Sequence, residues 1–208
     1  MLADERAQVA YERATELRPQ DSQGFVGMAH LRLLQGNFDA AREICRRLPN
    51  AQGEAAEIAA QIEFFERRFD VAVELYRQLH KANPYGGGSF YGATSYCSAA
   101  GRAKQALGDW AEAKRILEDC LIRERANVER EPNTPRAFYR LAAAEACLGM
   151  TEDAMSHLRK SIALGWVEYR SLNLDPRFDA LRGPELQAMI DELAARVADM
   201  KRQAIALR

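Results

Sequence analysis

The side chains that could support nucleophilic, acid–base or metal chemistry are few in this chain and lie far apart. No two histidines stand at metal-ligand spacing, and no Cys-x-x-Cys pair occurs. The motifs of a nucleophilic serine, a dinucleotide site and a Walker-type phosphate loop are also absent from the sequence. The sequence therefore predicts no enzyme activity, no cofactor and no metal site. The histidines and cysteines that were considered as ligands or nucleophiles are His30, His80, His157, Cys45, Cys97, Cys120 and Cys147.

Three consecutive glycines, Gly86 to Gly88, are the other feature that could contact a ligand. Backbone amides of a glycine-rich loop can bind phosphate, but the Gly-Lys-Ser/Thr pattern that follows such a loop is missing here. Consecutive glycines also suit a flexible connection between two helices. We favour the connector, and a binding loop is the alternative.

The elements that carry these residues are indicated by a turn motif that recurs along the chain. Each copy ends in an alanine, and these alanines are 31, 41 and 41 residues apart. A small residue on the buried side of a helix lets a facing helix approach closely, and a larger apolar residue follows four positions later on the same stripe. The pattern predicts repeated units of helix, turn and helix. The copies are Gly36–Ala41, Arg67–Ala72, Gly108–Ala113 and Gly149–Ala154.

This pattern, closed by a proline such as Pro84, resembles the tetratricopeptide repeat. The resemblance implies an all-α fold, a right-handed superhelical solenoid of antiparallel helix hairpins. Half a repeat is expected over residues 1–19, and fuller repeats over about 22–51, 53–84, 86–131 and 135–165. The helices of the repeat at 86–131 look longer than the others, at 89–107 and about 110–128.

Residues 166–208 lie beyond the repeat pattern. Within them, 173–184 predict a short helical turn between two prolines, and 184 to about 206 predict a capping helix with one apolar stripe. This segment looks like the tail that closes repeat arrays in bacterial multidomain signalling proteins.

Charge and composition narrow the class of partner. Lys and Arg total 29 against 30 Asp and Glu, with the two signs interspersed, which is typical of a solvated helical surface and not of a nucleic-acid interface. No apolar run reaches membrane-spanning length, and the first residues are too polar for a signal peptide. We expect a cytoplasmic protein without a membrane partner. Because the sequence starts inside a repeat, it is also expected to be part of a longer chain.

The expected function is a scaffold or adaptor that holds a protein or peptide segment in the concave groove of the solenoid. The alternative is a regulatory C-terminal segment of a larger bacterial signalling protein, such as a cyclase, a kinase or a transcription regulator. The cut first repeat also predicts self-association, because Val9 and Tyr11 lack a partner helix. By the register of related repeats, the groove is lined by Val26, His30, Gln61, Phe64, Arg102, Arg136 and Tyr139.

Overall fold

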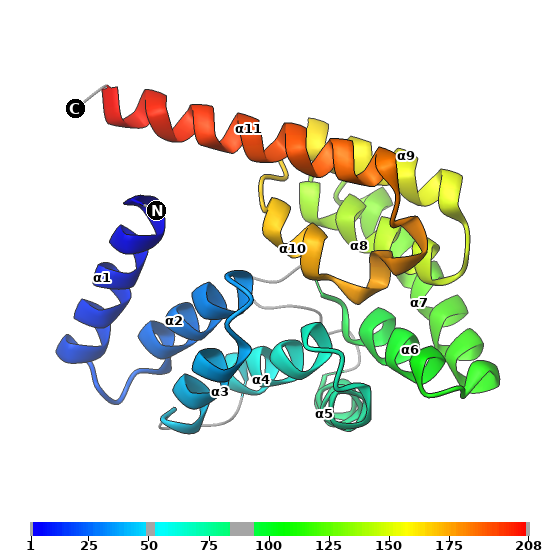
Figure 1. Ribbon diagram of the computed structural model, residues 1–208. Coiled ribbons are helices and arrows are strands. Elements are labelled where there is room, and N and C mark those ends of the chain that lie inside the picture. The colour runs from blue at the N-terminus through cyan, green and yellow to red at the C-terminus, as the bar shows by residue number, and fades with distance from the viewer. Residues whose placement is uncertain (1, 49–52, 84–93, 207–208) are drawn as a thin grey trace. The chain divides into compact units, whose positions relative to one another are not determined.

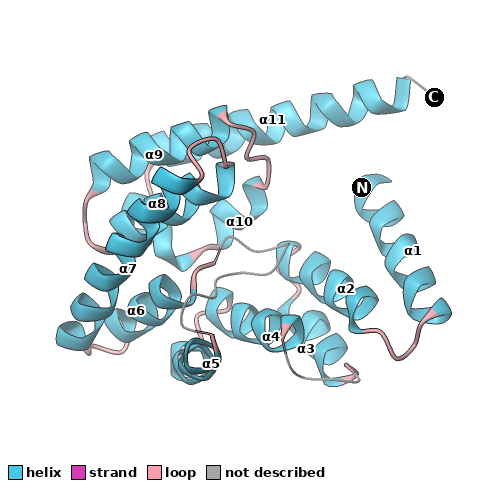
Figure 2. Ribbon diagram, turned by 180° about the vertical axis from the view of Figure 1, so that it is seen from behind, coloured by secondary structure: helices cyan, strands magenta, loops and turns pink. Residues whose placement is uncertain are grey.

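The computed structural model describes residues 2–48, 53–83 and 94–206, and helices make up the regular structure of these ranges (Figures 1 and 2). The chain folds as two compact units, residues 1–108 and 109–208. The prediction of an all-α fold is confirmed. The dividing point lies inside the predicted repeat at 86–131, and the repeat boundaries themselves stay a prediction.

The first unit is a series of helices in which neighbours along the chain pack together. Helix α1 packs on α2, α2 on α3, α4 on α5, and α5 on α6, while α2 and α3 both also contact α4. The α2–α3 pair therefore packs on the first helix of the α4–α5 pair, as expected for stacked repeats. The helices are α1 (Leu2–Leu17), α2 (Ser22–Leu34), α3 (Phe38–Arg46), α4 (Glu54–Phe65), α5 (Phe69–Ala82) and α6 (Tyr96–Ala106).

The second unit is centred on α8, which packs on α7, on α9 and on a 3-10 helix, η1. The last helix, α11, packs on α10. The predicted helical turn and the predicted last helix are both present, as η1 and α11. The elements are α7 (Trp110–Arg130), α8 (Pro135–Cys147), α9 (Thr151–Ala163), α10 (Tyr169–Leu174), η1 (Pro176–Leu181) and α11 (Pro184–Ala206).

The alanines of the turn motif form the centre of each hairpin. Ala41, Ala72, Ala113 and Ala154 are all completely buried. Burial of a side chain no larger than a methyl group allows the backbones of two helices to approach closely. The larger residues four positions later, such as Leu117 and Leu158, are buried as well, so the apolar stripe predicted from spacing is the packed face.

The turns after α2, α4, α8 and α9 share one hydrogen-bond pattern that ends the preceding helix. After α2, the Gly36 amide donates to Leu33 O, and the next amide donates five residues back. The same pair of bonds follows α4, where Arg67 donates to Phe64 O at 3.1 Å and Arg68 to Glu63 O at 2.8 Å. This is the Schellman motif, whose central residue has a left-handed backbone and is usually glycine. Arg67 adopts it with a φ of 66°.

Helix α1 lies on α2 at two glycines. A Cβ atom at Gly27 would stand 2.6 Å from Tyr11 Cδ1, and one at Gly24 would stand 2.7 Å from Thr15 Cγ2. The Tyr11 ring is therefore covered by α2, contrary to the expectation that it lacks a partner helix. Val9 remains 64% exposed, and association of copies through α1 stays a prediction.

Two helix assignments from the sequence need correction. Helix α6 starts at Tyr96 and not at residue 89, because Thr94 and Ser95 lie outside the helix and Ser95 has an extended backbone. Residues 89–93 and the glycine run are outside the described ranges. Helix α10 was not predicted; Glu168 caps it by accepting a hydrogen bond from the Arg170 amide at 3.2 Å.

Among the described helices, none has the length and apolarity to cross a membrane.

Candidate partner-binding surface

Four of the seven predicted groove residues lie buried on α2 and α4 of the first unit, namely Val26, His30, Gln61 and Phe64. Phe64 has no exposed surface, and its ring packs edge-on against Phe69 and Tyr76, each at a centroid distance of 5.8 Å. Such contacts are typical of a core aromatic residue. Phe64 is therefore a core residue of the first unit, and its place in the lining of a groove stays a prediction.

Gln61 is also turned to the interior. Its Nε2 atom donates to Thr94 Oγ1 at 2.9 Å, and both side chains are buried. The bond joins α4 to the residues just before α6. A buried amide must be hydrogen-bonded to offset its lost hydration, so Gln61 serves packing in this unit. Arg102, on α6, is only half-buried, with its guanidinium carbon 5.4 Å from the Phe69 ring centroid.

The remaining two predicted residues lie on α8 in the second unit. Arg136 is half-buried, whereas Tyr139 is 1% exposed. The Tyr139 ring stacks on Trp166 at a centroid distance of 4.3 Å, and its hydroxyl donates to Asp175 Oδ2 at 3.1 Å. Burial raises the pKa of the Tyr139 hydroxyl well above its ordinary value, and the nearby Asp175 charge raises it further. Tyr139 is thus buried like Phe64, and its role in partner binding stays a prediction.

A buried ion pair between Asp175 and Arg177 completes this cluster. Arg177 Nε lies 3.0 and 3.1 Å from the two carboxylate oxygens, and neither side chain has exposed surface. The Arg177 guanidinium also lies over the Tyr139 ring, at 5.7 Å from its centroid. Both charged residues contact Tyr139 on α8, and these contacts join η1 to that helix. Sequence reasoning missed the ion pair, because charged residues are frequent in this segment and the sequence does not show which of them are buried.

A second buried charge joins α8 to α9. Glu145 Oε2 lies 2.7 Å from His157 Nδ1, and Glu145 is 1% exposed. Burial raises the pKa of the Glu145 carboxyl, and the hydrogen bond from His157 lowers it by a smaller amount. The Asp153 charge also raises the pKa, and the Arg125 charge lowers it. The carboxyl is thus harder to ionise in the folded chain than in the unfolded chain.

This shift predicts a pH-dependent contribution to stability. A folded pKa above the unfolded value means that the contribution is complete below the unfolded pKa, about 4.3, and is lost as pH rises through the folded pKa. The stability of the wild type relative to the Glu145→Gln variant should therefore fall as the pH rises above about 4.3. Urea titrations of both proteins at a series of pH values measure the difference. A difference that is constant or rises with pH would contradict the prediction.

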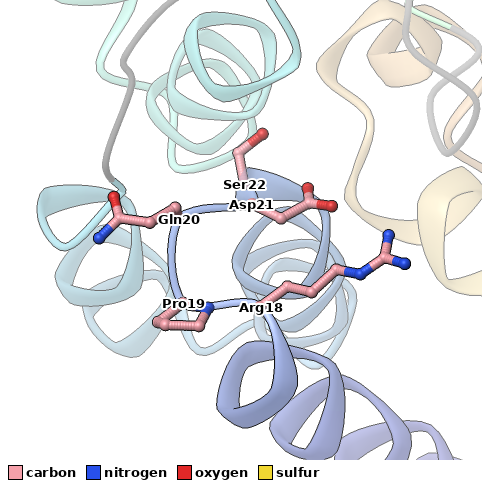
Figure 3. Close-up of a pocket in the computed structure, with 5 residues that line it drawn as sticks. All are labelled: Arg18, Pro19, Gln20, Asp21 and Ser22. Carbon is pink, nitrogen blue, oxygen red and sulfur yellow. The ribbon is translucent and has the colours of Figure 1, made fainter.

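The turn between α1 and α2 borders an open depression formed by residues Arg18 to Ser22 (Figure 3). Asp21 caps α2 there, because its Oδ1 accepts a hydrogen bond from the Gln23 amide at 3.0 Å. The Gln20 side chain points to the opposite side from those of Arg18 and Asp21 (Figure 3). The polar groups of this turn therefore do not converge on one point, as the groups of a binding site would.

Two stretches match family models for the tetratricopeptide repeat, residues 5–62 and residues 95–119. The first stretch spans α1 through most of α4, and the second contains α6 and the start of α7. The chain contains tetratricopeptide repeats. The resemblance inferred from the turn motif is thereby confirmed.

Further comparisons of this tetratricopeptide-repeat chain give more distant similarities. No curated protein matches it significantly. A structure described as "Crystal structure of MamA" is 15% identical over 77% of this chain and 88% of that chain, with a TM-score of 0.43. Another, described as "MamA MSR-1 C2", is 20% identical over 78% of this chain and 87% of that chain, with the same TM-score.

Tetratricopeptide repeats are modules for protein–protein interaction, and such modules are typically not catalytic. A general role as an interaction scaffold follows for this chain from its repeat matches. Of the seven predicted lining residues, Arg102 and Arg136 are the two that are not buried. Partner binding by any of the seven stays a prediction.

Proposed function

We propose that the chain is a scaffold that holds a segment of a partner protein on the first helices of its repeats. The observation that supports the proposal most is the pair of repeat matches, at residues 5–62 and 95–119. Stacked repeats of this kind present extended binding surfaces. With Phe64 and Tyr139 buried, the anchors proposed within the two units are Arg102 and Arg136.

Arginine suits this role for physical reasons. It is enriched among the residues that dominate binding energy, because its planar guanidinium can bind carboxylates and stack on rings at the same time. Arg102 already lies over the face of Phe69. This contact holds the arginine side chain in place and so reduces the conformational entropy that it loses when a partner binds.

The proposal predicts a specific loss of partner capture. We expect the folded wild-type chain to retain a defined protein from the lysate of its source organism, and the Arg102→Ala/Arg136→Ala variant to lose it. Truncating a binding anchor typically costs at least about 2 kcal/mol, roughly a thirtyfold loss of affinity. Affinity capture followed by mass spectrometry of the retained proteins measures both results.

A matched control uses two exposed arginines on second helices. The Arg13→Ala/Arg46→Ala variant removes the same charge from side chains that are 66% and 67% exposed, and it should retain the partner. Capture of nothing by the folded wild type would refute the proposed function. The alternative of a regulatory segment in a larger signalling protein stays a prediction, since neither repeat match reaches residues 166–208.

A further inference from the structure

A groove between α9 and α11 in the second unit has the features of a docking site. It holds about 330 Å³ and is open on one side. We call it the α9–α11 groove. Its volume lies at the lower end of the range of ligand sites, which suits a short segment with one inserted side chain. It is lined by Arg159, Ile162, Ala163, Met189, Glu192, Leu193 and Arg196.

The floor of the groove is apolar. Leu193 is 2% exposed, while Ile162 and Met189 keep part of their surface open to solvent. Covering such surface releases about 25 cal/mol per Å². An apolar side chain of a partner would therefore gain free energy on this floor, and the flexible Met189 can adapt to its shape.

Arg196 lies at the edge of this floor, where its exposed side chain is hydrogen-bonded to the main chain. Its Nη2 atom donates to the backbone oxygens of Ile162, at 3.4 Å, and Trp166, at 3.2 Å. Within the described residues it pairs with no carboxylate, and its Nε and Nη1 atoms have no acceptor. The Nε and Nη1 donors can bind a carboxylate, and their position is already set by the carbonyls.

The other two charged residues of the lining, Arg159 and Glu192, affect how strongly the groove attracts a carboxylate. Arg159 pairs with Glu185, which lies outside the lining. Glu192 forms no ion pair among the described residues and adds one negative charge. The charges of the lining that have no ion-pair partner among the described residues are therefore one cation, Arg196, and one anion, Glu192. A carboxylate is favoured at Arg196 because two of its donors remain available, and Glu192 weakens this preference.

We propose that the α9–α11 groove binds a partner segment that presents a carboxylate beside an apolar side chain. The carboxylate binds Arg196, and the apolar side chain covers Ile162 and Leu193. This inference rests on the proposed scaffold function and adds a second contact site with a stated partner chemistry.

The test is a selection of binders from a phage-displayed library of random peptides on the intact chain. We expect enriched peptides to carry Asp or Glu next to an apolar residue. For a synthetic copy of the best peptide, fluorescence anisotropy should show about tenfold weaker binding to the Arg196→Gln variant. Binding to Glu192→Gln should be about two- to threefold tighter, because a like charge is removed.

The matched control is Arg202→Gln on the same helix, outside the lining. Arg202 pairs with Asp199 and is 71% exposed, so peptide affinity should not change. A purely structural Arg196, holding only the end of α9, would not produce the gain in Glu192→Gln. Circular dichroism checks that each variant is folded.

Three outcomes would overturn the inference: no enriched peptide, enriched peptides without a carboxylate, or unchanged affinity in Arg196→Gln. These outcomes are separable from failure of the scaffold function. If the peptides or the captured partner respond to Arg102→Ala/Arg136→Ala but not to Arg196→Gln, the scaffold stands and the α9–α11 groove is not its site.

Discussion

Replacing Arg177 by methionine is expected to destabilise the second unit by about 3–5 kcal/mol, because it leaves the Asp175 carboxylate buried without its counter-charge. The guanidinium contacts both carboxylate oxygens and also covers the Tyr139 ring. Urea denaturation followed by tryptophan fluorescence measures the loss. A Trp110→Phe background leaves Trp166, which stacks on Tyr139, as the reporter.

Two further variants make this prediction specific. The double variant Asp175→Asn/Arg177→Met should recover most of the loss, since removing both charges of a buried pair is often neutral. The control Arg202→Met changes an exposed arginine and should stay within about 0.5 kcal/mol of the wild type. If Arg177→Met were as stable as this control, the ion pair would not hold η1 against α8.

Replacing Gly27 by valine is expected to separate α1 from α2. The new side chain would occupy the space of the Tyr11 ring, as a Cβ would stand 2.7 Å from Tyr11 Cζ. Overpacking of this kind costs about 1–3 kcal/mol. Because α1 packs on α2 in the first unit, the effect should concentrate in α1. Hydrogen exchange should show faster exchange of the α1 amides, with little change in α4 and α5.

Relief of the clash provides the control. In the double variant Gly27→Val/Tyr11→Ala, the ring is gone and part of the protection of α1 should return. Valine at the exposed position Gln23 tests the cost of a β-branched residue in α2 alone, about 0.5 kcal/mol. Equal protection of α1 in the Gly27→Val variant and the wild type would show that Tyr11 can move aside without loss of packing.

Much of the local structure could be predicted from the sequence, because the signals are local. The turn motif located the buried alanines, such as Ala72 and Ala154, and the apolar stripe gave the last helix, Pro184–Ala206. The start of α6 was predicted too early, at residue 89, because helical spacing continues upstream of Ser95, whereas Ser95 itself has an extended backbone. Periodicity alone does not detect such a change of backbone.

The candidate site was harder to predict, because exposure depends on contacts between distant residues. Phe64 and Tyr139 occupy register positions that face a groove in related repeats, yet aromatic and polar contacts bury both. The bond between Tyr139 and Asp175 spans 36 residues, and no spacing rule relates such positions. Register identifies a helix face, whereas burial depends on what packs against that face.

The left-handed backbone of Arg67 affects how repeats are recognised from sequence. The turn after α4 forms the same backbone hydrogen bonds as the turns after α2 and α8, where Gly36 and Gly149 supply the left-handed residue. Yet both the α4–α5 turn and the entire α8–α9 hairpin lie outside the family matches. Since main-chain bonds define the turn, its sequence can diverge while its shape is kept. A repeat count obtained from sequence profiles is then a lower bound on the number of hairpins that such a chain folds.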